Sequence, residues 1–554
     1  MCDNLFIMWI SAINLNNYRC FKSLQLTAFK DLNIIVGENN IGKSSVFNAI
    51  SKLIRVAWDT EPYKEVFQQT DIRYNNLSSG PVFISCIFSL EPHEMQDILN
   101  FIARESFDQR KKGILYRHLK PLLSNLEVVF EWSETSVERY SKLGPLFIHK
   151  VSFGLERIVE GSIQNMEQLL NQLVSPQYKG NLDELLQQAK VWSLHTETSY
   201  LLSIIRPKFS YFEEFRARPS RRERTDALSS LEGSQTANVL LNLKNHVDRQ
   251  QRDRYIGIKY AFSSLFPALK IEAVESGPGT GIADIQFREI GNRYPVPLEN
   301  VGAGVIELLT LLTNLITLRN HIFVIEEPEL HLHPHAKRCL GELIQKAARK
   351  NQVFVITHDP VFLNPDYIHK LSRFYIKTKK GGTTVASFSS NLSTRDIGQI
   401  NTAVKDLSKR EVFFSRAILF VEDESQEKFI IECAKKLGFS LDNMGLSIIE
   451  VGGKDGFGPY VKLAEQLNIP FMCLADLSWG SSPDKPLKVY RSLGYELEEY
   501  LQKVGLDSLM EQARRKVGRN KPRIARYCGE HIEVNQIPQV ISQLINDAVK
   551  LCKK

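Results

Sequence analysis

The chain has 554 residues, more than one hydrophobic core normally organises, which predicts about two to four domains. Hydrophobic residues make up 43% and charged residues 24%, a balance that excludes a disordered or fibrous chain. The net charge of +7 is small for this length, so it permits nucleic-acid binding without requiring it.

The sequence favours neither a membrane segment nor a thiol framework. The longest apolar stretch, 305–318, is interrupted by Glu307 and Asn314, and the first residues lack a basic segment and a small-residue cleavage site. The eight cysteines form no C-x-x-C pair, which favours reduced, buried thiols over a zinc or disulfide framework. We therefore expect a cytoplasmic protein with no membrane partner.

The first part of the chain predicts strands that lead into a loop. Residues 11–36 alternate apolar and polar side chains in two short runs, the period of half-buried strands. Further strands are expected at 82–90 and 126–132. Leu and Ile recur at helical spacing over 92–123 and 162–204, and we expect the second of these to be a helical insertion.

The middle of the chain alternates helix and strand. A helix is expected over 235–252, and two buried strands of the parallel-sheet type are expected at 321–327 and 352–358. A helix over 335–349 separates them. A hairpin follows at 373–389, where Lys-Gly-Gly predicts the turn, and then a polar tract marks a domain boundary.

The segment IIVGENNIGKSSVFNAI, residues 34–50, predicts a phosphate site. Residues 37–44 match G-x-x-x-x-G-K-[ST] between a strand and a helix, the context that this pattern requires. Glycines let backbone N–H groups surround the phosphates, the lysine reaches the outer phosphates, and the serine hydroxyl binds Mg²⁺. We expect ATP with Mg²⁺ or Mn²⁺, bound by the loop and the first helical turn: Gly37, Asn39, Asn40, Gly42, Lys43, Ser44 (also a metal ligand) and Ser45.

Two later strand ends supply the polar partners that such a loop needs. Glu326 is expected to hold the Mg²⁺ through water, and Glu327 to orient the attacking water. Asp is commoner than Glu at the first of these positions, so Glu326 is a mild departure. His358 ends the next strand, where its imidazole is placed to sense the γ-phosphate. The alternatives are a solvated acidic strand end and a structural histidine.

These motifs resemble ATPases of the ABC type found in DNA-repair and chromosome-structure proteins. The resemblance implies that two heads enclose the nucleotide and that a signature loop of one head closes on the phosphates of the other, in a dimer or higher homo-oligomer. The candidate loop is ENVGAGVIELL, 299–309, although Leu-Ser-Gly-Gly-Gln is absent. Gly302 and Gly304 open a helix there and can present N–H groups to the partner's γ-phosphate. The alternative is an ordinary helix-start loop.

A second α/β pattern begins at Ala417 and predicts a metal site. One hydrophobic strand ends at Glu422 and a later one ends at Asp476, with VGGKDGF, 451–457, between them. Two carboxylates at strand ends of one sheet make a metal site. The pattern resembles a Toprim domain, the Mg²⁺-dependent module of topoisomerases, primases and some nucleases.

An ABC-type ATPase followed by Toprim resembles the OLD (overcoming lysogenization defect) family, which includes the Gabija nuclease subunit and retron-associated effectors of bacterial anti-phage defence. IEEPELHLHP, THDPVFL and VGGKDG all look like that family. The resemblance implies an α/β fold: an ABC-type ATPase head with a helical insertion, then a Toprim α/β domain. The expected parts are 1–155 (N-terminal part of the ATPase), 156–210 (helical insertion for dimerisation), 211–390 (C-terminal part of the ATPase), 391–411 (linker) and 412–554 (Toprim).

Two acidic positions of the family are not acidic here. The family motif Glu-Gly-x-Thr-Glu (or -Asp) has an acid at its last position, where this chain has Gln426. The family's Asp-x-Asp also ends on an acid, where this chain has Ser478. The chain therefore offers fewer anionic oxygens to a metal. Candidates to complete the site are Asp423, Glu427, Asp455 and Asp484. Downstream, Glu496, Glu498 and Glu499 resemble the family's acidic patch, with Glu498 as a metal ligand.

Two basic features point toward a phosphate-bearing partner. Lys521 matches a family lysine that steadies a pentavalent phosphate. The segment FRARPSRRER, 215–224, holds five arginines that suit DNA phosphates, an intersubunit cluster near ATP, or a solvated loop. No aromatic-interleaved basic stripe is visible, so sequence-specific readout is not expected.

Two functional hypotheses follow. The first is a homo-oligomeric OLD-family ATPase whose Toprim domain cuts DNA with Mg²⁺, using Glu422 and Asp476 on the metal and Lys521 on the phosphate, while ATP gates the cut. The second is an ATP-dependent DNA clamp or sensor whose Toprim domain has lost catalysis and binds a defence-system partner, either protein or nucleic acid. Gln426 and Ser478 favour the second; the length of the match and the nearby acids favour the first.

Overall fold

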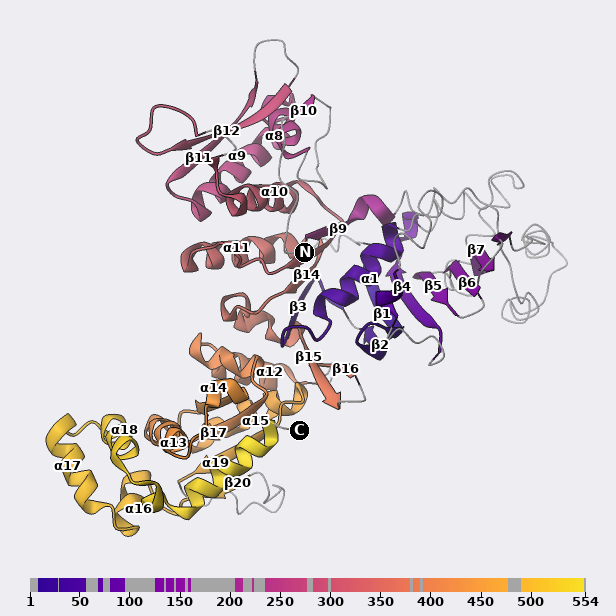
Figure 1. Cartoon of the computed structure of the whole chain (residues 1–554). Coiled ribbons are helices and arrows are strands. Elements are labelled where there is room, and N and C mark those ends of the chain that lie inside the picture. The colour runs from indigo at the N-terminus through magenta and orange to yellow at the C-terminus, as the bar shows by residue number, and fades with distance from the viewer. Residues whose placement is uncertain are drawn as a thin grey trace. The chain divides into compact units, whose positions relative to one another are not determined.

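The computed structural model (Figure 1) describes residues 8–27, 29–55, 68–72, 80–94, 125–133, 136–143, 146–154, 158–160, 205–212, 222–223, 235–276, 282–296, 300–378, 382–388, 392–476 and 490–552. The chain forms two compact units. The first consists of Met1–Ile35, Asn39–Thr357 and Lys379–Val385, and the second of Val36–Glu38, His358–Thr378 and Ala386–Lys554.

The first unit contains a seven-stranded antiparallel sheet. Its order is β2-β1-β4-β5-β6-β7-β8. The strands are β1 (Trp9–Tyr18), β2 (Phe21–Thr27), β4 (Val82–Ser89), β5 (Asn125–Trp132), β6 (Ser136–Leu143), β7 (Leu146–Gly154) and β8 (Ile158–Glu160). Several positions along β1, β2 and β4 alternate between buried and more exposed, as the sequence period predicted, and the expected strands at 82–90 and 126–132 are confirmed.

A parallel sheet provides the second layer of this unit. Strands β3 (Leu32–Gly37), β14 (Gln352–Ile356), β13 (Ile322–Glu326) and β9 (Phe209–Phe212) are neighbours in that order. Every residue of β3, β13 and β14 is buried, which explains their predominantly apolar sequences. The helices α1 (Lys43–Arg55), α10 (Ala303–Thr317) and α11 (Pro334–Ala348) connect to these strands, and the expected helix at 335–349 is α11.

The helix expected over 235–252 is two helices, α8 (Thr236–Asn245) and α9 (Arg249–Leu265). His246 is extended, and the side chain of Asp248 accepts a hydrogen bond from the amide of Gln250. An aspartate in that position caps a new helix, so the apolar period continues across a break. These helices pack with a three-stranded sheet of β10 (Arg222–Glu223), β12 (Ile282–Glu289) and β11 (Leu269–Glu275).

The tract expected as a linker, 391–411, contains regular structure. It holds α12 (Thr394–Ala403), capped by Ser393, and the start of the 3-10 helix η9 (Ser408–Phe413). Before it stand η7 (Pro360–Phe362), η8 (Pro365–Lys370), β15 (Leu371–Thr378) and β16 (Gly382–Ser387), the last two forming the arms of the expected hairpin.

The second unit carries an all-parallel sheet in the order β18-β17-β19-β20. Its strands are β17 (Ala417–Val421), β18 (Leu446–Glu450), β19 (Phe471–Ala475) and β20 (Tyr490–Ser492). Its helices are α13 (Glu424–Lys436), α14 (Leu441–Met444), α15 (Phe457–Gln466), α16 (Leu497–Lys503), α17 (Asp507–Val517), α18 (Lys521–His531) and α19 (Gln539–Cys552), drawn in orange to yellow in Figure 1. One apolar core joins this sheet to α13, α18 and α19.

Some sequence features fall outside the described residues. These include most of the expected helical insertion, all of the arginine-rich segment 215–224 except β10, and Ser478 and Asp484. No helix of the described ranges is both long and apolar enough to cross a membrane.

Gln352 fastens the two sheets of the first unit together. Its side chain accepts a hydrogen bond from the Ile10 amide at 2.7 Å and donates one to the Ile10 carbonyl at 2.9 Å, where the β1–β4 ladder is irregular.

Gln352→Leu leaves both backbone groups of Ile10 buried without that partner. We expect it to lower the free energy of unfolding by about 2–4 kcal/mol in chemical denaturation. The control Gln250→Leu, on the exposed face of α9, should change stability by less than about 0.5 kcal/mol; equal effects of the two substitutions would contradict the assignment.

Candidate functional site

The phosphate loop joins β3 to α1 with the backbone that its motif requires. Asn40 and Gly42 have φ values of +61° and +96°. A Cβ on Gly42 would lie 2.2 Å from Sγ of Cys20 and 2.8 Å from the Phe21 ring, so only glycine fits. The loop therefore packs directly against the turn between β1 and β2, and that contact sets its curvature.

The first helical turn presents the two side chains expected to meet phosphate and metal. Lys43 is 6% exposed, Ser44 is exposed and Ser45 is half-buried. The N-terminus of α1 adds its own preference for an anion.

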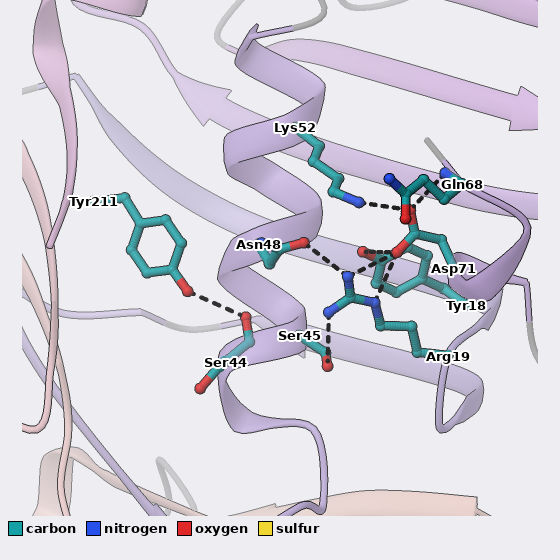
Figure 2. A network of polar contacts seen from close by, with 9 residues as sticks. All are labelled: Tyr18, Arg19, Ser44, Ser45, Asn48, Lys52, Gln68, Asp71 and Tyr211. Atoms are coloured by element: carbon teal, nitrogen blue, oxygen red, sulfur yellow. Dashed lines mark hydrogen bonds and ion pairs between the residues drawn. The ribbon is translucent and has the colours of Figure 1, made fainter. Parts of the chain in front are cut away.

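Tyr211, from β9, links this turn to the carboxylate strand. Its hydroxyl donates to Oε1 of Glu326 at 2.7 Å. The same hydroxyl lies 3.5 Å from the Ser44 carbonyl oxygen (Figure 2). Glu326, the last residue of β13, is 7% exposed. The motifs at 43–44 and 326 therefore belong to one site, and a tyrosine far from both in sequence holds them together.

Glu327 follows Glu326 in a strained conformation. Its φ is +42°, which is uncommon for a residue other than glycine, and its amide donates to the Ile356 carbonyl at 2.9 Å. Strain of this kind is concentrated at functional sites. His358 follows Thr357, which comes directly after β14 and donates its hydroxyl to Glu329.

A buried aspartate organises the side chains beside the loop (Figure 2). Asp71 is 1% exposed and accepts from Lys52 at 2.6 Å, from Arg19 at 2.7–2.8 Å, and from the Gln68 amide. Burial alone would raise the pKa of Asp71, but the Lys52 hydrogen bond, the Gln68 amide and the Arg19 charge hold it below its ordinary value. Arg19 also reaches Ser45 and Asn48 of α1.

A pocket of about 440 Å³ opens at this network. Its lining is Arg19, Cys20, Asn40, Gly42, Ser45 and Thr70. The sequence motif predicted three of these residues. No role was predicted for Arg19 or Asp71, because their roles depend on a fold contact between distant segments.

The candidate signature loop leads into α10. Gly302 is the N-cap, is exposed and has no side-chain cap, so the first N–H groups of α10 are free of such a cap. A Cβ on Gly304 would lie 2.7 Å from Cβ of His331. Gly304 therefore also has a packing reason to be glycine.

In the second unit, Glu422 and Asp476 lie at the carboxyl ends of the neighbouring strands β17 and β19. Oε2 of Glu422 accepts from the Asp476 amide at 2.8 Å. Gln426, fully buried in the first turn of α13, bridges them: its Oε1 accepts from the Glu422 amide at 3.0 Å and its Nε2 donates to Oδ1 of Asp476. Gln426 therefore has an amide at the position where the family resemblance predicts an acid. Its Nε2 donates to Oδ1 of Asp476, an oxygen that a carboxylate at the same position would repel.

Asp476 carries an unusual charge state. Burial raises its pKa to about 7, the Gln426 hydrogen bond opposes this, and the negative charges of Asp423, Glu422 and Glu496 add to the rise. Asp423 caps α13 by accepting from the Gln426 amide. The raised pKa of Asp476 therefore reflects burial first and the neighbouring carboxylates second.

The donors fit a hard divalent cation. Within the described ranges, no three His, Cys, Asp or Glu side chains are grouped to hold a metal. Mg²⁺, however, is usually bound by one or two carboxylates, with water and substrate phosphate completing its shell. Glu422 and Asp476 provide that pair. Oε1 of Glu498, a side chain that pairs with Lys521 through its other oxygen, is buried without a hydrogen-bond partner.

The remaining predicted residues divide between this cluster and its surroundings. Lys521, at the start of α18, pairs with Glu496 at 2.9 Å and with Glu498 at 3.8 Å, and these carboxylates keep its pKa above the ordinary value. The Glu427 carboxyl has its pKa raised by burial, and its charged neighbours are Lys428, Lys409 and Glu450. It therefore faces a different surface from Asp476.

An ion pair inside the second unit joins the phosphate-loop sequence to the Toprim-like sheet. Nε and Nη2 of Arg416 donate to the two carboxylate oxygens of Glu38 at 2.7 and 2.8 Å. Arg416 immediately precedes β17, the strand that Glu422 follows. No sequence signal predicted this pair, because its members are 378 residues apart.

Removing the Tyr211 hydroxyl tests the link between α1 and β13. We expect Tyr211→Phe to slow ATP hydrolysis about tenfold and to change nucleotide affinity less, because a hydrogen bond to a charged group is lost at Glu326. Tyr260→Phe, at a side chain that is 77% exposed, is the control. Steady-state hydrolysis with nucleotide titration measures both, and an unchanged rate in Tyr211→Phe would show that the link is dispensable.

Asp71→Asn tests the buried network and its pH dependence. We expect a loss of about 2 kcal/mol in the free energy of unfolding at neutral pH. Because the folded-state pKa of Asp71 lies below its ordinary value of 3.8, this stabilisation is fully present above that value and is lost as pH falls through the lower folded pKa. Denaturation of both proteins over acidic and neutral pH measures it, with Asp253→Asn, at an exposed helical position, as control. A pH-independent difference would exclude the charged network as its source.

Comparisons with known proteins agree with an ATPase part that is followed by a Toprim part. A profile described as "AAA ATPase domain" matches residues 8–143, and one described as "AAA domain, putative AbiEii toxin, Type IV TA system" matches 168–364. A third, "Overcoming lysogenization defect protein-like, TOPRIM domain", matches 413–477. The α/β fold class expected from the sequence is confirmed.

The relatives come from bacteria, an archaeon and a bacteriophage. The chain is 21% identical to the OLD nuclease of Thermus scotoductus over 84% of its own length and 81% of that protein. It is 23% identical to endonuclease GajA of Bacillus cereus over 80% of its length and 70% of GajA. It is 24% identical to the uncharacterized protein MJ1542 of Methanocaldococcus jannaschii over 42% of its length, and it spans 28% of that protein.

Among solved structures, the C-terminal region of the Burkholderia pseudomallei OLD protein matches 25% of the chain at 24% identity, with a TM-score of 0.21. The sequence comparisons establish the relationship over most of the chain. The protein is therefore a relative of the OLD nucleases and of GajA, and it joins AAA-type ATPase domains to an OLD-like Toprim domain.

Proposed function

We propose that the chain is an ATP-regulated, metal-dependent DNA endonuclease of the OLD type that acts in bacterial anti-phage defence. The ATPase domains and the nuclease relatives support ATPase and nuclease activity in general terms. The observation that carries the proposal is the contact between Glu422 and Asp476 at adjacent strand ends, with the Glu496–Lys521 pair beside them.

The Toprim chemistry follows from these groups. A bound Mg²⁺ or Mn²⁺ would supply positive charge for the reacting phosphate and its attacking water. Glu422 and Asp476 would hold it. Glu498 stays a predicted further ligand that the described structure does not group with them. Lys521 leaves its carboxylate partner and binds the phosphate. There it offsets the negative charge that develops on the phosphate oxygens. Water adds to phosphorus, the bond to the departing sugar oxygen breaks, and that oxygen takes up a proton.

The ATPase site has its own division of roles. The residues 37–45 of the loop and first turn bind ATP, while Ser44 and Glu326 hold its Mg²⁺. Glu327 orients the attacking water and His358 senses the γ-phosphate. In a homo-oligomer, Gly302 and Gly304 present the N-terminus of α10 to the nucleotide of a second subunit.

Regulation by ATP is supported by the ion pair between Glu38 and Arg416. Glu38 belongs to the phosphate-loop sequence, so nucleotide binding changes its surroundings, and Arg416 leads directly into β17. The two side chains are 42% and 48% exposed. An exposed pair of this kind contributes about 0–1 kcal/mol, enough to bias the Toprim site but too little to lock it.

One observation favours a second function. Gln426 replaces an acid and already occupies Oδ1 of Asp476, so one ligand oxygen is committed to an amide. If that hydrogen bond persists when metal is present, the Toprim domain is a degenerate module. The chain then acts as an ATP-dependent DNA clamp or sensor that binds a partner protein or nucleic acid.

Cleavage assays with the purified full chain separate these functions. Wild type should nick or cut plasmid DNA with Mg²⁺ or Mn²⁺, whereas Glu422→Ala and Asp476→Ala should each lose about 100-fold or more, because even outer partners of metal ligands are worth about 10–100-fold. Glu465→Ala, at an exposed helical carboxylate, is the matched control. Cleavage that survives both site substitutions would reject the nuclease assignment. DNA retention with ATP hydrolysis and no cleavage would support the clamp.

A further inference from the structure

We propose that the turn between α17 and α18 binds the phosphate backbone of duplex DNA and delivers it to the Toprim carboxylates. We call residues 514–526 the basic turn. This inference rests on the proposed nuclease function, and it assigns the DNA contact to a surface different from the arginine-rich segment 215–224.

The basic turn has an extreme local charge. Within residues 514–526 there is no Asp or Glu, and seven residues are basic and exposed: Arg514, Arg515, Lys516, Arg519, Lys521, Arg523 and Arg526. The whole chain has a net charge of +7 over 554 residues, so this density is far above its average. A dense basic patch attracts a polyanion and binds it by releasing counterions.

Several of these charges are not used within the fold. Arg515 pairs with Glu511, Arg526 with Glu530, and Lys521 with Glu496. Among the described residues, no carboxylate lies within ion-pair distance of four others: Arg514, Lys516, Arg519 and Arg523. Exposed charges that have no carboxylate partner in the fold are available to phosphates.

The basic turn is held at the carboxylate cluster. Lys521 pairs with Glu498 and with Glu496, and the charge of Glu496 acts on Asp476. Behind it, α18 packs closely on α13, where a Cβ on Gly529 would lie 2.7 Å from Cβ of Glu432. Since α13 is capped by Asp423 and carries Gln426, this packing fixes the distance from the basic turn to the metal ligands. A backbone bound there places one phosphate beside Lys521.

The surface fits duplex DNA better than a membrane. Membrane-surface helices need an exposed apolar face, and the apolar residues Met510 and Ala513 of α17, like Ile524 of α18, are buried in the core. Residues 514–526 contribute none of the large exposed apolar side chains of the described chain. They also carry no exposed aromatic stacking platform, which single-stranded binders use. With a membrane and a single strand disfavoured, the surface fits sequence-independent contact with the duplex backbone.

Binding of a short fluorescein-labelled duplex by the full chain, without divalent metal, tests the surface apart from catalysis. We expect Arg519→Gln combined with Arg523→Gln to weaken binding at every sequence tested and to reduce the slope of log K against log salt by about 2, one phosphate contact for each arginine. Lys405→Gln combined with Lys436→Gln removes the same charge at exposed lysines elsewhere in the second unit, and should leave the slope unchanged.

The outcomes separate the surface from the nuclease. Equal affinity and slope in the two double variants would overturn the basic turn as the DNA surface, as would a wild type that binds no duplex. Selective loss of binding to anionic lipid vesicles, with DNA binding intact, would overturn it in favour of a membrane. In each case the nuclease assignment is judged separately, by whether Glu422→Ala abolishes cleavage. ATP hydrolysis at wild-type rate confirms that the variants are folded.

Discussion

Buried negative charge at the ends of parallel strands is the constraint around which the second unit is built. Neighbouring strands β17 and β19 bring Glu422 and Asp476 into contact, and burial raises the pKa of Asp476 to about 7. Such a pair is stable when something supplies positive charge or a hydrogen bond. Gln426 supplies the hydrogen bond, Lys521 lies beside the cluster, and a divalent cation completes the neutralisation in the proposed enzyme.

The first unit solves the opposite problem, because its loop is built for an anion. Backbone amides and Lys43 gather positive potential at the start of α1. The side chains around them are then placed by one buried acid, Asp71, which holds Arg19 and Lys52 against the helix. Tyr211 fixes the carboxylate strand to the same turn. Both units therefore position charge through groups that never touch the reacting atoms.

Local sequence patterns predicted the parts of this architecture that depend on residues close together in the chain. These parts are the phosphate loop and the strands that lead to Glu326, Glu422 and Asp476. Each has a run of apolar residues followed by a polar residue or a glycine, and each lies at its predicted position. The break between α8 and α9 was missed because the apolar period runs across it, and only the cap at Asp248 reveals it. The roles of the predicted site residues stay predictions.

Contacts between distant segments were beyond such patterns. Tyr211 and Asp71 are single residues with ordinary neighbours, and their importance comes from what the fold brings to them. Gly304 looked like part of a signature loop, and the structure adds a close contact with His331. The basic residues of the turn can be read from the sequence. Only the position of the turn beside Glu496 and Glu498 distinguishes it from a solvated helix end.

The central claim is that two carboxylates and an amide still form a working metal site. Its most direct test is Mn²⁺ binding, followed by electron paramagnetic resonance, to full-length Lys43→Ala, which removes the nucleotide-dependent metal site. The account predicts one bound Mn²⁺ whose affinity falls at least about tenfold when Asp476→Asn is added. Equal Mn²⁺ binding with and without Asp476→Asn would contradict it, and the Toprim domain would then be a binding module.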